Sequence, residues 1–257
     1  MKLLLFLLLP CLAFGQIEFV EKKALTADSF IGVDSYGNYY SLSNNALVKT
    51  ALDQQFNYAD FTLGKITEVD IINPLRILVY YADFNIVVFL DNTLNEIERI
   101  NFNEVEGYLN IETVRLANNN SVWVFNKDNQ QVELYNYRSG NRTVISQPVS
   151  GNLRFTASDF NFIHLLTDEE IITYNVYGSI ISQYRNPGYV KLYNSSKGVV
   201  GIDDNGVLYF TEKPGEQLSL DDEQLRAIFG ESDLLLNSEF LYIYDGEFVY
   251  SYRLTEH

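Results

Sequence analysis

Cysteine and histidine, the residues from which zinc modules and disulfide scaffolds are built, are almost missing from this sequence. The 257-residue chain has one cysteine and two histidines, which argues against a Cys/His zinc module and a disulfide framework. Basic residues are also scarce, since 18 Lys and Arg stand against 34 Asp and Glu, for a formal net charge of −16. Nucleic-acid binding depends on Lys and Arg that displace counterions, so no nucleic-acid partner is expected.

Proline and glycine are too few for a collagen-like or low-complexity chain, with 5 and 15 residues respectively. Apolar residues, in contrast, make up 47% of the chain and aromatic residues 14%, with 19 Tyr and 17 Phe. Intrinsic disorder requires low hydrophobicity, so this composition indicates a folded chain with a sizeable core.

The first 15 residues have the features of a secretory signal peptide. Lys2 precedes an apolar run over residues 3–9, far shorter than the ~20 residues of a membrane span, and residues 13–15 read Ala-Phe-Gly. We expect a signal peptide over 1–15 and a soluble exported domain over 16–257, in the periplasm or at the outer membrane of a Gram-negative cell. Lipidation of Cys11 is the alternative processing.

A hairpin pattern recurs through the chain about every 40 to 45 residues. Polar turns separate pairs of apolar strands at residues 34–37, 82–85, 127–129, 167–169, 203–206 and 245–246. The strands expected before the turns are 30–33, 77–80, 122–125, 162–165, 199–202 and 240–243. The strands expected after them are 39–42, 87–90, 132–135, 171–174, 207–210 and 248–251. Most copies contain a further strand on either side, and four short strands per unit are typical of a β-propeller blade.

The sequence therefore predicts an all-β fold, a six-bladed β-propeller of four-stranded blades. The strand at 17–20 would be the outer strand of the last blade and close the ring, which hides an edge. A short helix is expected near 220–229, because Ser219 is a good N-cap and Gly230 ends the helical pattern. A β-sandwich or a β-barrel, and a ring of five or seven blades, remain alternatives. The repeat resembles degenerate WD40-like and quinoprotein-like propellers, a resemblance that implies architecture and no functional residue.

Few residues are candidates for chemistry. His164 lies on a predicted inner strand, where a packed and hydrogen-bonded core residue is expected rather than a catalyst. The run 203–206 resembles the start of a calcium loop but returns at once to a strand, so a hairpin turn is expected. Glu68, Asp70 and Glu112 lie on strands expected to border the central channel, where they would act as solvating groups or form the carboxylate pair of a glycosidase.

The tyrosines are the most numerous candidates for recognition. Packing between blades accounts for most of them, but tyrosine also anchors protein interfaces. The predicted partner-binding residues are Tyr81, Tyr137, Tyr177 and Tyr252.

The expected function is a non-enzymatic, protein-binding platform that is a monomer on its own and needs no cofactor. One concrete form is an accessory or plug-like subunit of an outer-membrane secretion complex such as the type 9 system. The alternative is a propeller that binds or cleaves carbohydrate in its central channel. A quinone- or metal-dependent dehydrogenase is disfavoured by the single tryptophan, Trp123, and by the scarcity of metal ligands.

Overall fold

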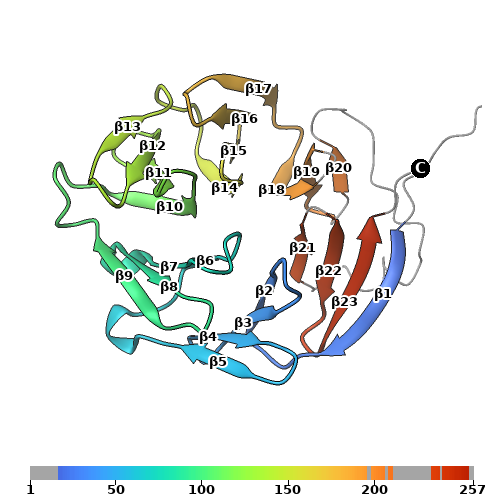
Figure 1. Ribbon diagram of the computed structural model, residues 1–257. Helices are drawn as coiled ribbons and strands as arrows, with labels where there is room; N and C mark the ends of the chain where they lie inside the picture. Colours follow the sequence, from blue (N-terminus) through green and yellow to red (C-terminus); the bar gives the residue numbers. More distant parts are fainter. Residues whose placement is uncertain (1–16, 196–197, 206–207, 211–232, 238, 255–257) are drawn as a thin grey trace, which may run out of the picture.

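The chain folds into a β-propeller, with small antiparallel sheets arranged around a central axis (Figure 1). The computed structural model describes residues 17–195, 198–205, 208–210, 233–237 and 239–254. Within these ranges the helical elements are two single 3₁₀ turns, η1 (Phe61–Leu63) and η2 (Ala82–Phe84). The all-β architecture predicted from the repeat is confirmed.

Three sheets come from the first half of the chain, each with its strands in sequence order from the centre outwards (Figure 1). The first contains β2 (Ser29–Val33), β3 (Tyr39–Ser43), β4 (Ala46–Thr50) and β5 (Gln55–Tyr58). The second contains β6 (Glu68–Asp70), β7 (Ile77–Tyr81), β8 (Ile86–Leu90) and β9 (Glu96–Asn101). The third contains β10 (Ile111–Leu116), β11 (Ser121–Asn126), β12 (Gln131–Asn136) and β13 (Arg142–Val144).

The second half of the chain supplies the other three sheets. The fourth contains β14 (Leu153–Ser158), β15 (Phe162–Thr167), β16 (Glu170–Asn175) and β17 (Ile180–Arg185). The fifth contains β18 (Tyr189–Ser195), β19 (Gly198–Asp203) and β20 (Leu208–Phe210). The sixth contains β21 (Asp233–Leu236), β22 (Phe240–Tyr244), β23 (Phe248–Leu254) and β1 (Ile17–Ala24).

Five of these sheets are four-stranded blades, which corrects the prediction of six. The sheet β18-β19-β20 has three strands among the described residues. The predicted helix near 220–229 and the predicted signal peptide over 1–15 lie outside the described residues.

The ring closes by pairing the two ends of the described chain, as the segment 17–20 predicted. β1 pairs antiparallel with β23 along its length, from Ile17 opposite Leu254 to Ala24 opposite Phe248, with one irregularity between Phe19 and Glu21. In the order β1-β23-β22-β21, β1 is the outermost strand of its sheet. The pairing covers an edge of β23 that would otherwise expose unpaired backbone groups.

One predicted hairpin is shifted by one strand relative to the other five. The turn at 34–37 joins the first and second strands of its sheet, whereas the other predicted turns join the second and third. The equivalent turn is Asn44-Asn45, between β3 and β4, where both residues have positive φ (52° and 60°). Such φ values suit a two-residue hairpin, and Asn tolerates them. With this correction the first interval of the repeat is no longer its longest.

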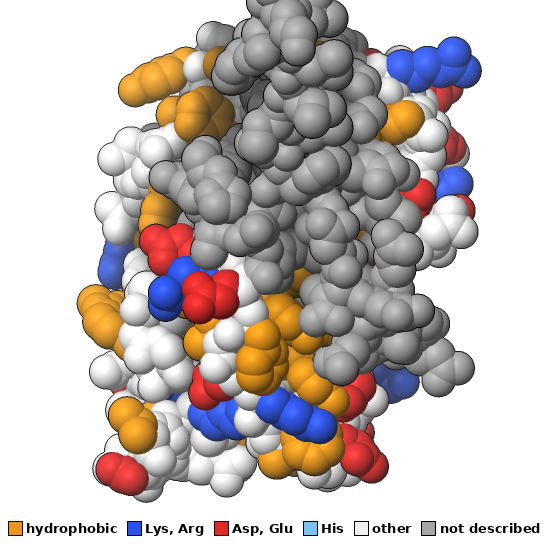
Figure 2. All heavy atoms as spheres, turned by 90° about the vertical axis from the view of Figure 1, so that its right-hand side faces the viewer, with side chains coloured by type: hydrophobic (Ala, Val, Ile, Leu, Met, Phe, Trp, Pro, Cys, Tyr) orange, Lys and Arg blue, Asp and Glu red, His pale blue; other side chains and the backbone are white. Residues whose placement is uncertain are grey.

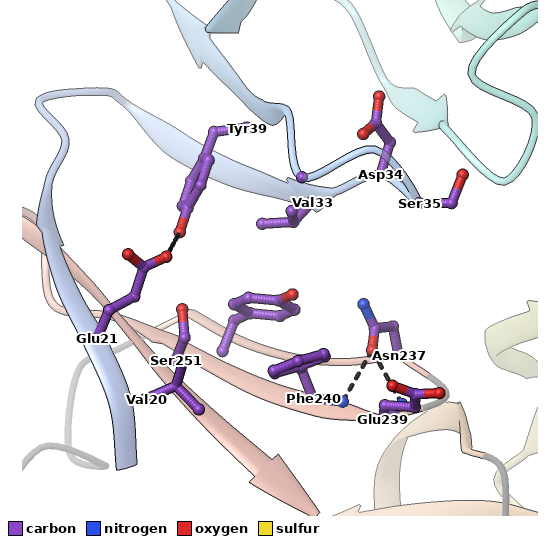
Figure 3. A pocket seen from close by; sticks show the side chains of 12 residues that line it. Val20, Glu21, Val33, Asp34, Ser35, Tyr39, Asn237, Glu239, Phe240 and Ser251 are labelled. Carbon is purple, nitrogen blue, oxygen red and sulfur yellow. Dashed lines mark hydrogen bonds between the residues drawn. The ribbon is translucent and has the colours of Figure 1, made fainter. Parts of the chain in front are cut away.

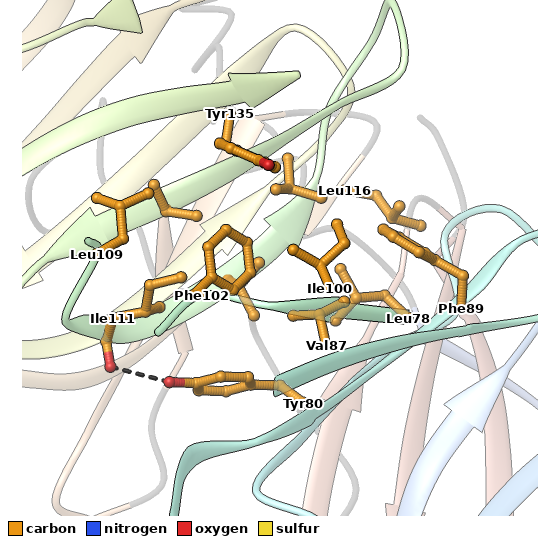
Figure 4. Close-up of a cluster of buried hydrophobic side chains, with 13 residues drawn as sticks. Leu78, Tyr80, Val87, Phe89, Ile100, Phe102, Leu109, Ile111, Leu116 and Tyr135 are labelled. Atoms are coloured by element: carbon orange, nitrogen blue, oxygen red, sulfur yellow. Dashed lines mark hydrogen bonds between the residues drawn. The ribbon is translucent and has the colours of Figure 1, made fainter. Parts of the chain in front are cut away.

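The core is divided among the interfaces between neighbouring sheets. Each of the six adjacent pairs of sheets shares one cluster of buried apolar side chains. Middle strands are buried on both faces, as in β7 and β8, while outer strands such as β9 and β17 are largely exposed. Figure 4 shows the cluster between the second and third sheets, where the Tyr80 hydroxyl donates to the Ile111 carbonyl at 3.0 Å.

On the outer side of the ring near β1, apolar and charged side chains are mixed (Figure 2). Phe19 and Val20 are about half exposed, and the Lys22 ammonium lies 3.7 Å from the centre of the Phe248 ring. No helix within the described ranges has the length and apolar character needed to cross a bilayer.

Candidate functional site

A cavity of about 540 Å³ occupies the centre of the ring. The first strand of every sheet contributes to its wall, and so do the residues at the carboxyl ends of these strands, among them Ser35, Ile72, Asp159, Ser195 and Asn237. The carboxyl ends of these inner strands therefore meet on one side of the ring. We call this side, with the turns that follow the inner strands, the inner-turn face.

Two predicted channel acids lie on β6 and bind the backbone of the next blade. Glu68 Oε2 accepts hydrogen bonds from Thr113 Oγ1 (3.0 Å) and from the Val114 N–H (3.2 Å). Asp70 Oδ2 accepts from the Leu116 N–H at 2.8 Å. An inner strand has one edge without a neighbouring strand, so its amides need acceptors. Glu68 and Asp70 supply these acceptors to β10, a structural role that the sequence did not predict.

Hydrogen bonds continue from Glu68 on β6 to the inner strands of the next two sheets. The hydroxyl oxygens of Thr113 and Thr156 are 3.0 Å apart and both residues are buried, so β10 and β14 are linked. The Arg115 guanidinium, which lines the cavity, lies 4.0 Å from Glu68 Oε1. The centre of the ring is thus a hydrogen-bonded side-chain network with one cation beside it.

The third predicted acid, Glu112, takes a different position. It pairs with Lys127 at 2.7 Å, and both side chains are about half exposed. Glu112 is therefore not brought together with Glu68 and Asp70. Among the described residues no group of three His, Cys, Asp or Glu side chains is placed to hold a metal ion.

A second pocket, of about 430 Å³, lies where the sixth sheet meets the first (Figure 3). The Tyr39 hydroxyl donates to Glu21 Oε1 at 2.6 Å and so connects β3 to β1. Burial and this hydrogen bond raise the pKa of Tyr39, which keeps its hydroxyl protonated as the donor. On the other wall the Asn237 side chain accepts from the N–H groups of Glu239 and Phe240 (Figure 3). The two pockets share lining residues, including Asp34 and Asn237.

Asp34 stands between the two pockets with its carboxylate fully buried. Its oxygens accept from the Tyr36 and Asn38 N–H groups at 2.9 Å and from the Tyr40 hydroxyl at 3.0 Å. The Lys49 ammonium lies 4.0 Å away. This carboxylate holds the turn after β2 and the blade interior together.

His164 is a core residue, as the sequence predicted. It is 7% exposed on β15, and its Nδ1 lies 2.8 Å from Thr173 Oγ1 on the neighbouring strand β16. Burial lowers the pKa of His164 to about 4, so the ring is neutral near pH 7. The run beginning at Asp203 joins the antiparallel strands β19 and β20, as a hairpin requires, and Asp203 Oδ1 accepts from the Asn205 N–H at 2.9 Å, while residues 206–207 lie outside the described ranges.

The four predicted recognition tyrosines fall into two groups. Tyr81 and Tyr252 are buried, at 0% and 5% exposure, and belong to the core between blades, so they present no surface to a partner in this fold. Tyr137 packs against the Phe89 ring, with centroids 4.9 Å apart, and against the Arg76 guanidinium. Tyr177 is 88% exposed in the turn between β16 and β17.

The inner-turn face also has exposed apolar side chains that were not among the predicted residues. Successive strands are antiparallel, so turns after the first and third strands of each sheet emerge on this face. Tyr36, Leu75 and Phe160 lie in turns of the first kind and are 70%, 60% and 36% exposed. Tyr177 lies in a turn of the second kind. The sequence signal that could have indicated these residues is a large apolar side chain within a polar turn, such as Tyr36 between Ser35 and Gly37.

Comparisons with known proteins support the architecture. No family model matches the chain, and no curated protein matches it. A catalytically inactive virginiamycin B lyase from Staphylococcus aureus, solved with quinupristin, matches with a TM-score of 0.61 and 10% identity over 93% of this chain and 100% of that one. The WD40 domain of Neurospora crassa Pan2 matches with a TM-score of 0.55 and 8% identity over 90% and 76%.

A third solved structure comes from a secretion system. PorZ of Porphyromonas gingivalis, described as an essential bacterial surface component of the type-IX secretion system, matches with a TM-score of 0.52 and 11% identity. The match covers 86% of this chain and 31% of PorZ, so this chain corresponds to about a third of that protein. At such identities the likeness shows a shared β-propeller fold.

Proposed function

We propose that this protein is a non-enzymatic propeller that holds another protein against its inner-turn face. The observation that carries the proposal is the exposure of Tyr36, Leu75, Phe160 and Tyr177 on turns of the face where the inner strands end at the central cavity. Exposed aromatic side chains on a rigid support are typical anchors of protein interfaces, because each buries a large area and loses little conformational freedom.

The chemistry of the centre favours binding over catalysis. Glu68 and Asp70 accept hydrogen bonds from backbone amides of β10, so both carboxylates hold the neighbouring blade in place. His164 is neutral, buried and hydrogen-bonded within its own sheet.

We further propose that the partner belongs to a bacterial cell-envelope assembly, with the type-IX secretion machinery as the specific candidate. Two observations support this setting. The fold is shared with PorZ, a surface component of that system, and the first 15 residues have the pattern of a signal peptide. On this proposal the protein is an exported accessory subunit.

The test is affinity purification from native envelopes with a matched pair of surface variants. Tyr36→Ser combined with Tyr177→Ser removes two aromatic rings from the inner-turn face, whereas Tyr108→Ser removes a half-exposed ring from the turn between β9 and β10, on the opposite face. We expect the double variant to lose partner recovery by roughly tenfold or more, and Tyr108→Ser to retain it. Recovery of the wild-type protein as a bare monomer, or equal loss in both variants, would contradict the proposal.

Carbohydrate recognition is the second candidate, because the rings of Phe155, Tyr193 and Tyr242 line the central cavity. Aromatic faces are used to stack sugars, so binding on a glycan array would favour this function. A blank array would remove it.

A further inference from the structure

The central cavity is lined by one side-chain donor without a partner among the described residues and by a second donor with a single distant partner. Asn194, on β18, lines the cavity, and its Nδ2 atom is buried without a hydrogen-bond partner. Arg115, on β10, lines the cavity as well, and within the described ranges its guanidinium has only the Glu68 carboxylate at 4.0 Å, the limit of an ion pair. Buried side-chain donors are nearly always paired in native proteins, so Asn194 is expected to have an acceptor from outside the described residues.

The carboxylates beside these donors already accept hydrogen bonds from backbone N–H groups. Asp70 Oδ1 accepts from the Ile72 N–H at 3.0 Å and its Oδ2 accepts from the Leu116 N–H. Asp159 Oδ1 accepts from the N–H groups of Asn161 and Phe162 at 2.7 and 2.8 Å. Arg115 and Asn194 therefore remain available as hydrogen-bond donors in the cavity wall. They favour a ligand that carries acceptor oxygens.

The other residues that line the cavity favour a ligand with an apolar group. Aliphatic and aromatic side chains from five blades line the cavity, namely Ile31, Ile71, Phe155, Leu192 and Leu235. These side chains cannot satisfy the hydroxyl groups that a sugar would place against them. The volume of about 540 Å³ lies within the range of ~300 to 1,000 Å³ that is usual for ligand pockets.

The charge of the protein selects against an anionic ligand. The chain has a formal net charge of −16, and Asp70, Asp159 and Glu68 lie in or beside the cavity, whereas Arg115 is the one cation among its described lining residues. Such a field repels anions and attracts neutral segments with basic flanks. A peptide segment has all the required features, because its backbone carbonyls are neutral acceptors and an apolar side chain can fill the cavity.

We propose that the central cavity binds a short internal peptide segment of the partner protein. Its backbone carbonyl oxygens accept hydrogen bonds from Arg115 and Asn194, and an apolar side chain packs against Ile71, Phe155 and Leu192. This inference rests on the proposed function and adds the chemistry of the inserted segment. It gives the buried Asn194 donor a partner and gives Arg115 an acceptor closer than the Glu68 carboxylate at 4.0 Å.

The test uses a displayed library of random heptapeptides, selected on the full-length wild-type protein. Enriched peptides are synthesised with blocked ends, and their affinities are measured for the wild-type protein, Asn194→Asp, Arg115→Met and the control Asn129→Asp. Asn194→Asp replaces the donor by an acceptor inside the cavity, whereas Asn129→Asp places the same charge in an exposed turn on the opposite face. We expect enriched peptides to share a central apolar residue and to bind each cavity variant about tenfold more weakly or worse, with the control unchanged.

Three results would overturn the inference. They are the absence of enrichment, equal binding to wild type and Asn194→Asp, or a requirement for a free C-terminal carboxylate, which would indicate an anion site. Matching melting temperatures of the variants show that the fold is intact. Recovery of the envelope partner by Asn194→Asp, but not by the double variant of Tyr36 and Tyr177, would support the proposed binding function of the inner-turn face. The same result would contradict the insertion of a peptide segment into the cavity.

Discussion

Two interfaces between neighbouring blades are built in contrasting ways. Between the second and third sheets, 13 buried apolar side chains form one cluster, which includes Phe89, Phe102 and Leu109 (Figure 4). Between the sixth and first sheets, where the ring closes, the corresponding cluster has 5, namely Phe30, Tyr39, Tyr242, Tyr244 and Val249. A pocket of about 430 Å³ lies beside this second cluster.

The closing interface compensates with hydrogen bonds. The Tyr244 hydroxyl donates to the Ala27 carbonyl at 2.8 Å and accepts from the Ala27 N–H at 3.0 Å. Tyr39 binds Glu21, and β1 pairs with β23. Buried apolar surface stabilises the folded state in proportion to its area, so the larger cluster contributes more. A hydrogen bond within the protein replaces one to water, so each contributes a net ~1 kcal/mol to stability. We infer that the closing interface is the weaker of these two.

The largest expected effect on stability comes from removing one aromatic side chain from each interface. Phe102→Ala, at a fully buried position, is expected to lower the free energy of unfolding by about 4 kcal/mol. Phe30→Ala is expected to cost about 2 to 3 kcal/mol, because its surroundings border a pocket and can relax. Urea denaturation measures both values, and hydrogen exchange in β1 and β23 should speed up only in Phe30→Ala. Equal losses in the two variants would argue against a weaker closing interface.

The pH dependence of stability that His164 causes probes the interior of the fourth sheet, away from the closing interface. Its pKa of about 4 in the folded state lies below the unfolded value of about 6.5. Between these values the unfolded chain binds more protons, so stability falls as the pH drops from about 6.5 to 4, by about 3 kcal/mol in total. His164→Gln removes this contribution, while carboxylates with lowered pKa such as Asp91 act at lower pH in both proteins. Parallel stability curves between pH 6.5 and 4.5 would contradict the assignment.

The smallest expected effect concerns the hydrogen bond from Tyr39 to Glu21. Tyr39→Phe keeps the ring and removes the hydroxyl, so the free energy of unfolding should fall by about 1 kcal/mol. Glu21→Gln in the Tyr39→Phe background should then have little further effect, because the interaction it would remove is already absent. A full additive loss in the double variant, measured by urea denaturation, would show that the two side chains act independently.

The strands of the propeller could be predicted from the sequence because, apart from β1, each described strand pairs with a neighbour close along the chain. The predicted segments 77–80 and 87–90 are found as β7 and β8, and the segment 17–20 as part of β1. The shifted first turn shows the limit of this reading. Asn44-Asn45 lacks the glycine that is typical of a two-residue hairpin, so the sequence pattern indicates the turn at 34–37, which contains Gly37, instead.

The candidate site was predictable only in part. Glu68 and Asp70 were placed on inner strands, but their hydrogen bonds go to β10, about 46 residues further along the chain. Tyr81 and Tyr252 could not be told from Tyr177 by local pattern, because burial depends on the blade packed against each one. The donors Arg115 and Asn194 carry no sequence signal, since they belong to different blades.

The amino-acid sequence by itself determined the all-β fold and most of its hairpins, because alternation of apolar residues and turn chemistry act over a few residues. The repeat phase left the segment 17–20 without a hairpin partner nearby, which indicated the strand that closes the ring. Tertiary structure decided which carboxylates are satisfied, which tyrosines reach solvent and which donors face the central cavity. Those properties depend on contacts between side chains from different blades around a common axis, and no local sequence pattern specifies these contacts.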